Sequence, residues 1–87
     1  MNLYLIFQTK NDNYDTFDSA IVAAKTKKEA RMIHPSSFNM DGYDDWDGKD
    51  NEAYGSWTSS ENVNVELIGV AKKGTTKGVV LASYNAG

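Results

Sequence analysis

Cysteine is absent from this 87-residue sequence, and histidine and proline each occur once, as His34 and Pro35. Without cysteine there is no disulfide scaffold, no thiolate zinc site and no cysteine nucleophile. A single histidine excludes a multi-histidine metal site and leaves little for acid–base catalysis. The apolar run Leu3–Phe7 is too short for a membrane span, and no basic residue precedes it as in a signal peptide. We therefore expect a soluble, intracellular protein that does not bind a membrane.

Size and composition indicate a single domain covering residues 1–87. Hydrophobic residues make up 40% of the chain and charged residues 24%, which is ordinary for a globular protein. No internal repeat or proline-rich linker divides the sequence. A domain of this length buries only about 60–65% of the surface that its unfolded chain exposes. We therefore expect its stability to be modest.

The formal net charge of -3 is unevenly distributed along the chain. Residues 41–61 carry seven acidic groups and one lysine, for -6, whereas the remaining residues sum to +3. The protein is therefore a nearly neutral scaffold that carries one acidic segment.

Two strands are predicted in the first third of the chain. Leu3–Phe7 and Ala20–Ala24 are short apolar runs typical of buried strands. Asn11–Asn13 lies between them and favours a turn, because Asn and Asp tolerate left-handed backbone. We expect the two strands to pair antiparallel.

A short helix is predicted after the second strand. Thr26 and Glu29 have the spacing of a capping box, in which each side chain accepts a hydrogen bond from the backbone amide of the other residue. The helix should end near Ile33, because Pro35 disfavours helical geometry at the residue before it. A helix of two turns is not stable alone and must pack on the sheet.

Two further strands are predicted near the C-terminus. Val63–Leu67 alternates apolar and polar residues, and the apolar positions change parity around Gly69. Either both faces are buried there or a bulge at Gly69 shifts the register. Lys73–Gly78 is expected to form a hairpin loop before a last strand, Val79–Tyr84. The predicted fold class is α+β, with an antiparallel four-stranded sheet in the order β-β-α-β-β, one short helix and a long acidic aromatic loop.

The long segment 35–61 has no strand or helix period but contains many large aromatic residues. A two-turn helix cannot cover one face of a four-stranded sheet, so we expect Phe38 and Trp57 to fold back over it. Trp46 differs because aspartates flank it, and burying the ring would remove their carboxylates from water. We therefore expect Trp46 to be exposed or partly exposed.

The acidic segment is the candidate binding site. Aromatic residues among acids combine a buried anchor with steering charge, which favours a protein-binding surface. Three alternatives stay open: a solvated loop, an imitation of nucleic-acid charges, and a calcium site like an EF-hand loop. The calcium alternative places Asp41 at position one and Glu52 at position twelve, but Trp46 stands where that loop requires glycine. The candidate partner-binding residues are Tyr43, Asp44, Asp45, Trp46, Asp47, Asp50 and Glu52.

No arrangement of residues indicates an enzyme. The glycines of the acidic segment follow no predicted strand, so they do not form a phosphate-binding loop. No motif pairs a serine with His34, which is placed to interact with the helix C-terminus instead. The lysines around the helix favour a solvated face over a nucleic-acid patch. We expect no catalytic residue, no cofactor and no metal.

Four blocks of the sequence resemble a family of small phage- and prophage-encoded proteins. The blocks are Tyr14–Ala24, Glu29–Arg31, Ile33–Pro35 and Gly78–Gly87. Some members of this family are similar to anti-CRISPR proteins, small inhibitors that bind host interference machinery. The resemblance implies the cytoplasm of a bacterial host and assigns no contact residues. The acidic segment lies outside these blocks.

The leading hypothesis is a phage-encoded, non-enzymatic inhibitor that binds a host CRISPR effector subunit and blocks its access to nucleic acid. The protein would not contact nucleic acid directly. Its acids would steer it onto a basic surface, where Trp46 and Tyr43 would anchor it. The alternatives are a small calcium-binding or regulatory module and a phage structural or assembly protein whose sheet edges pair between copies. We expect a monomer or a weak dimer.

Overall fold

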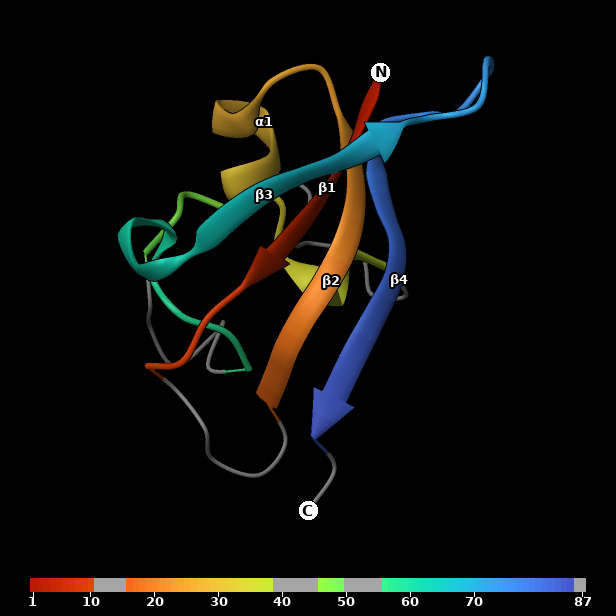
Figure 1. The fold of residues 1–87 in the computed structure, drawn as a ribbon. Coiled ribbons are helices and arrows are strands. Elements are labelled where there is room, and N and C mark those ends of the chain that lie inside the picture. The colour runs from red at the N-terminus through yellow and green to blue at the C-terminus, as the bar shows by residue number, and fades with distance from the viewer. Residues whose placement is uncertain (11–15, 39–45, 50–55, 86–87) are drawn as a thin grey trace.

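The computed structural model describes residues 1–10, 16–38, 46–49 and 56–85. In these ranges the protein has a small α+β fold, with a four-stranded antiparallel open sheet and one short α-helix (Figure 1). No helix in the described ranges is long and apolar enough to cross a membrane. The elements in chain order are β1 (Asn2–Phe7), β2 (Thr16–Ala24), α1 (Lys27–Arg31), η1 (Pro35–Phe38), η3 (Ser60–Asn62), β3 (Asn64–Val70) and β4 (Gly78–Asn85).

The strand order β3-β1-β2-β4 places the last two strands at opposite edges of the sheet. β1 and β2 pair antiparallel, as predicted. The prediction that Lys73–Gly78 closes a hairpin is wrong, because β3 pairs with β1 and β4 pairs with β2. The loop does contain a turn, in which Thr75 N donates to the Lys72 carbonyl oxygen at 3.0 Å. A turn motif does not by itself decide which strands pair. The connection projects beyond the sheet and returns to the start of β4 (Figure 1).

β3 contains a bulge beside Gly69, one of the two alternatives that the sequence left open. Leu3 lies opposite Gly69 and Tyr4 lies opposite Leu67, so Ile68 is an extra residue in β3. The other alternative, burial of both faces, is wrong because Leu67 and Ile68 are about half exposed. The bulged strand thus leaves apolar side chains in solvent at this edge of the sheet.

The helix begins where its capping residues predict. Thr26 Oγ1 accepts a hydrogen bond from the backbone N–H of Glu29 at 3.1 Å, which satisfies one of the free amides of the first turn. α1 ends at Arg31, two residues before the predicted end, with Met32 as its C-cap. Five helical residues cannot be stable alone, so packing must hold α1 in place.

Two kinds of contact fix α1 to the rest of the protein. Ala30 and Ile33 are buried against the sheet. Arg31 Nη1 donates hydrogen bonds to the carbonyl oxygens of Ser60 and Val63, in the segment that leads into β3. α1 therefore packs on the sheet and is also hydrogen-bonded to the segment that precedes the edge strand β3.

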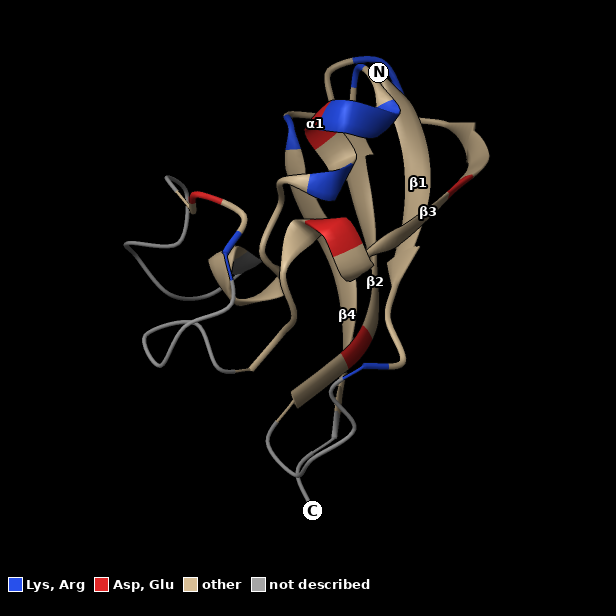
Figure 2. Cartoon of the chain, turned by 90° about the vertical axis from the view of Figure 1, so that its left-hand side faces the viewer, with Lys and Arg blue, Asp and Glu red and all other residues tan. Residues whose placement is uncertain are grey.

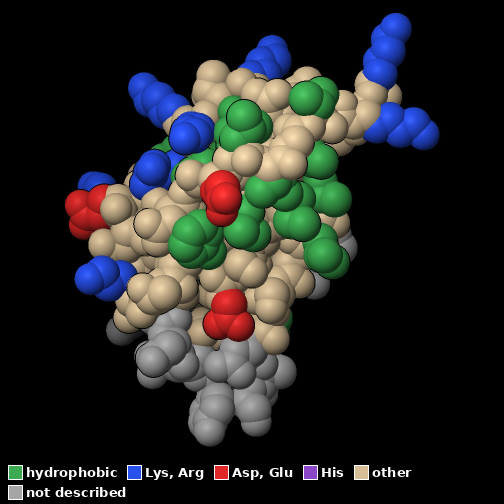
Figure 3. All heavy atoms as spheres, viewed as in Figure 1, with side chains coloured by type: hydrophobic (Ala, Val, Ile, Leu, Met, Phe, Trp, Pro, Cys, Tyr) green, Lys and Arg blue, Asp and Glu red, His purple; other side chains and the backbone are tan. Residues whose placement is uncertain are grey.

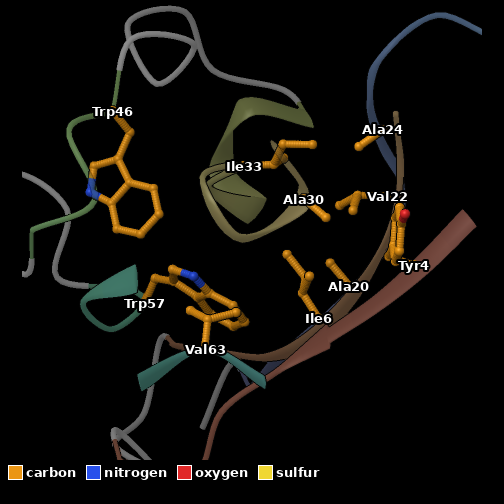
Figure 4. Close-up of a cluster of buried hydrophobic side chains, with 10 residues drawn as sticks. All are labelled: Tyr4, Ile6, Ala20, Val22, Ala24, Ala30, Ile33, Trp46, Trp57 and Val63. Atoms are coloured by element: carbon orange, nitrogen blue, oxygen red, sulfur yellow. The ribbon is translucent and has the colours of Figure 1, made fainter. Parts of the chain in front are cut away.

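The core lies between α1 and one face of the sheet, which we call the inner face. Trp57 is fully buried in this core, so the prediction that it folds back over the sheet is confirmed. The side chain of Phe38, the second predicted cover, lies outside what the structure describes. Figure 4 shows the cluster, which consists of Tyr4, Ile6, Ala20, Val22, Ala24, Ala30, Ile33, Trp46, Trp57 and Val63.

Candidate functional site

The structure describes two of the seven predicted partner-binding residues. Trp46 and Asp47 belong to the short described stretch 46–49. The other five lie outside the described residues: Tyr43, Asp44, Asp45, Asp50 and Glu52.

Trp46 is buried, contrary to the prediction that it is exposed. Its side chain is 4% exposed, and its indole Nε1 donates a hydrogen bond to the Lys49 carbonyl oxygen at 3.0 Å. Its ring meets the His34 ring edge-on, with 5.2 Å between the centroids. The prediction assumed that burial of the ring would desolvate the neighbouring acids, but Asp47 is exposed and accepts a hydrogen bond from Lys49 N. Adjacent side chains point in different directions, so the ring is buried while the carboxylate stays in water.

Gly48 fixes the same stretch against the body of the protein. Its carbonyl oxygen accepts a hydrogen bond from Ser60 N at 2.7 Å. Its φ of +83° lies in the left-handed region, which glycine adopts without a steric penalty. A Cβ at this position would lie 2.7 Å from Ser60 Oγ and 3.0 Å from Met32 Cε. Gly48 is therefore packed closely on Ser60 of η3 and on Met32, the C-cap of α1.

We expect Gly48→Ala to lower the free energy of unfolding by about 1–3 kcal/mol, because alanine is strained at positive φ and its Cβ would press on Ser60. Urea denaturation measures the effect. Gly74→Ala is the matched control, since Gly74 has a similar φ of +93° but nothing within 4 Å of an added Cβ. An equal loss in both variants would mean that the close packing of Gly48 contributes nothing.

A cavity of about 770 Å³ opens between α1 and the start of β4. Its walls are of mixed charge: Lys77 Nζ lies 3.9 Å from Glu29 Oε1, and Lys28 lines the same space. Figure 2 shows further basic residues around α1. His34 also lines the cavity; it is fully buried, and its Nδ1 accepts a hydrogen bond from Ser36 N at 3.0 Å. Among the described residues, no three His, Cys, Asp or Glu side chains gather as a metal site would require.

The face of the sheet opposite α1, which we call the outer face, exposes apolar side chains. Figure 3 views this face and shows hydrophobic side chains gathered over the strands. Leu81 is the most exposed of those that the register places there, at 62%. Four strands about 4.8 Å apart and about six residues long span about 400 Å², of which Ser19, Ser83, Asn64 and Glu66 contribute polar area. Exposed apolar side chains gathered on one face can mark an interaction site. The pairing register places on it Leu3, Leu5, Phe7, Ser19, Ile21, Ala23, Asn64, Glu66, Gly69, Gly78, Leu81 and Ser83.

The centre of the outer face is slightly hollow. A shallow depression of about 280 Å³ has apolar walls from Leu5, Ile21 and Leu81, with Ser19 and Ser83 at one end. Glu66, opposite Leu5, is the one charged residue among the twelve positions that the register places on this face. The shape and polarity of this depression suit an apolar side chain that projects from a partner.

The sequence contained a signal for the outer face. β1 is apolar at consecutive positions, so its two faces are both apolar, a pattern typical of strands that are covered on both sides. A single short helix and one folded-back segment cover a single face. Leu3, Leu5 and Phe7 alternate with the buried residues of β1, so they lie on the face that no described helix covers.

The blocks that resemble phage-encoded proteins fall mainly on regular elements. They include β2, the second half of α1 and β4, and thus two of the four strands of the outer face. The resemblance itself stays a prediction. Comparison of the chain with protein-family models, with curated proteins and with solved structures finds no match.

Proposed function

We propose that this protein acts by binding another protein through the outer face of its sheet. The observation that carries the proposal is the apolar surface of Leu5, Ile21 and Leu81, whose shallow depression lies open to solvent. Burying this surface against a partner would remove apolar area from water, which is the main driving force of protein association.

The partner that fits is a protein with an apolar projection beside a basic surface. The outer face carries Glu66 and no basic residue at its register positions, and Asp18 in β2 is exposed nearby. The acidic segment 41–61 adds a formal charge of -6. Charge of one sign speeds encounter with a surface of the opposite sign and orients it, whereas the apolar contact supplies most of the affinity.

The narrower proposal is that this partner is a CRISPR effector subunit in the cytoplasm of a bacterial host. It rests on the resemblance of the sequence to phage-encoded proteins, some of which are similar to anti-CRISPR inhibitors. Effector subunits bind nucleic acid through basic grooves, so a small acidic protein seated there would block nucleic-acid access. In this scheme the exposed Asp47 steers the protein together with Asp44, Asp45, Asp50 and Glu52, and Tyr43 supplies an aromatic contact. Trp46 has no contact role because it is buried.

Leu81→Asp is expected to abolish inhibition in a phage plaquing assay on a host with an active CRISPR system. The substitution places a charge in the centre of the proposed contact, where burial of an ion without a partner weakens binding by at least about 100-fold. Because Leu81 is 62% exposed, the fold should be unaffected. Circular dichroism and thermal melting check this directly.

Val70→Asp is the matched control for this experiment. Val70 in β3 is 77% exposed and pairs with Asn2. Asn2 alternates with the outer-face residue Leu3, so Val70 lies on the side of the inner face. Its variant introduces the same charge on an apolar residue away from the proposed contact and should keep full inhibition. Full inhibition by a folded Leu81→Asp protein would overturn the outer face as the binding surface.

A further inference from the structure

One end of the sheet gathers lysines from two separate parts of the chain. Asn2 pairs with Ala24 on one side and with Val70 on the other, and Gly78 pairs with Ala23, so all four strands are level at this end. The segment that leaves β2 and the connection from β3 to β4 therefore meet there (Figure 1). We call it the basic end after its exposed lysines, which are Lys25, Lys27, Lys28, Lys72, Lys73 and Lys77.

The basic end is positive although the whole chain is acidic. It holds six of the nine Lys and Arg residues of the sequence. Glu29 is the one acid that the structure describes there, and its Oε1 lies 3.9 Å from Lys77 Nζ. Two other described acids, Asp18 and Glu61, adjoin the opposite end of the sheet. The strands separate the two ends by about 17 Å, which exceeds the screening length of about 8 Å at physiological salt.

The backbone of the loop that carries Lys72 is held in place. Thr75 N and Thr75 Oγ1 both donate to the Lys72 carbonyl oxygen, at 3.0 Å and 2.6 Å. Ala71 N donates to the Met1 carbonyl oxygen at 2.9 Å, which fixes the base of the loop beside β1. At the tip, Gly74 has a φ of +93° and nothing within 4 Å of an added Cβ. The loop is thus ordered and open, so binding there would cost little backbone entropy.

We propose that the basic end binds the phosphate backbone of a nucleic-acid duplex. Lysine ammonium groups and threonine hydroxyls are common donors to phosphate oxygens, and residues 72–77 consist of lysine, threonine and one glycine. Residues 25–28 add three lysines and a threonine. Neither segment contains Arg, Asn or Gln, so the contact reads few base edges. Neither contains an aromatic residue on which the bases of a single strand would stack, which favours a duplex.

An anionic membrane is the other large polyanion that such a surface meets, and the chemistry of the loop disfavours it. Proteins that lie on a membrane combine basic residues with Trp, Phe or Leu that enter the acyl boundary. Residues 72–77 contain none of these. Figure 3 shows Lys and Arg side chains that project from this end in different directions, so a flat bilayer would face only some of them. A duplex presents phosphates on both sides of a groove, within reach of lysines that diverge.

The inference goes beyond the proposed function and uses a different surface. The lysines around the helix alone favoured a solvated face, but the loop lysines, which occur much later in the chain, join them in the folded protein. The proposal also departs from the sequence hypothesis that the protein does not contact nucleic acid directly. Binding of a duplex by the purified protein is measured without any protein partner, so it stands or falls separately from the outer face.

Fluorescence anisotropy with a short labelled DNA duplex tests the proposal. The unmodified protein should bind with a Kd of about 10⁻⁴–10⁻⁶ M at physiological salt and more tightly at low salt, because binding releases counterions. Lys72→Gln with Lys73→Gln should weaken binding at low salt by at least about tenfold, and should reduce the slope of log K against log salt concentration by about 2.

Lys10→Gln with Lys49→Gln is the matched control. It removes the same charge from two exposed lysines outside the basic end and should change the Kd less than about twofold. Equal losses in the two double variants would mean that net charge alone acts, and would overturn the proposal. Absence of binding at low salt by the unmodified protein, to DNA and to RNA duplexes alike, would also overturn it.

Two further measurements separate the alternatives. Duplexes of different sequence should bind with equal Kd, and a strong preference for one sequence would contradict backbone binding. Co-sedimentation with vesicles that contain phosphatidylserine tests the membrane. Vesicle binding that Lys72→Gln with Lys73→Gln abolishes, together with no binding of a duplex, would assign the basic end to a membrane surface and overturn the proposal.

Discussion

Trp57→Ala is expected to lower the free energy of unfolding by about 3–5 kcal/mol, the usual cost of deleting a fully buried tryptophan from a core. Trp57 is 0% exposed and belongs to the cluster between α1 and the inner face (Figure 4). A domain of this length has a total stability of only about 4–13 kcal/mol. The variant should therefore be largely unfolded at moderate urea concentrations, and urea denaturation followed by circular dichroism measures the loss.

Trp57→Phe is the control for this result. Phenylalanine keeps an aromatic ring in the same site and leaves a smaller void, so the loss should be clearly smaller than for alanine. Leu67→Ala is a second control, since Leu67 is 54% exposed and its truncation should change stability by at most about 0.5 kcal/mol. A Trp57→Ala protein with an unchanged midpoint would contradict the core placement of Trp57.

Trp46→Ala is expected to lower the free energy of unfolding by a similar amount, about 3–5 kcal/mol. The substitution empties a buried site, removes the edge-on contact with His34 and leaves the Lys49 carbonyl oxygen without its indole donor. The sequence hypothesis of an exposed anchor makes the opposite prediction: lost inhibition with unchanged stability. Thermal melting and plaquing of the same variant therefore distinguish a core residue from a contact residue.

Separate acid variants complete that test. A variant that combined Trp46→Ala with charge reversal would not separate unfolding from lost binding. Asp45→Lys with Asp47→Lys, on a chain that keeps Trp46, changes the charge alone. Charge at the rim of an interface acts mainly on the association rate, so this variant should associate more slowly with the proposed effector subunit. The difference in rate should be largest at low salt. An association rate equal to that of the unmodified protein would remove the acidic segment from the binding scheme.

The local elements were predictable because interactions between residues close together in the sequence determine them. The run Leu3–Phe7 forms a strand, and Thr26 caps the helix through the amide of Glu29. The point near Gly69 where the alternation of apolar and polar residues changes corresponds to the bulge in β3. Each of these features depends on residues a few positions apart, so the sequence contains the information directly.

The placement of the candidate site was less predictable. Trp46 was predicted to be exposed because the residues next to it in the sequence are acidic. The types of the flanking residues do not, however, determine the direction in which a side chain points. The contacts that bury it come from His34 in the segment after α1, and Ser60 N holds the adjacent Gly48 from η3. Such contacts join segments more than ten residues apart, and no local pattern specifies them.

By itself, the sequence determined the class of the elements, the absence of thiol chemistry and the concentration of acid in residues 41–61. Only the tertiary structure decided that β3 and β4 lie at opposite edges, that Trp46 is buried and that Leu81 on the outer face is exposed. The physical reason is that backbone propensity and capping act within a few residues. Strand order and burial depend instead on which apolar surfaces of the whole chain are removed from water together.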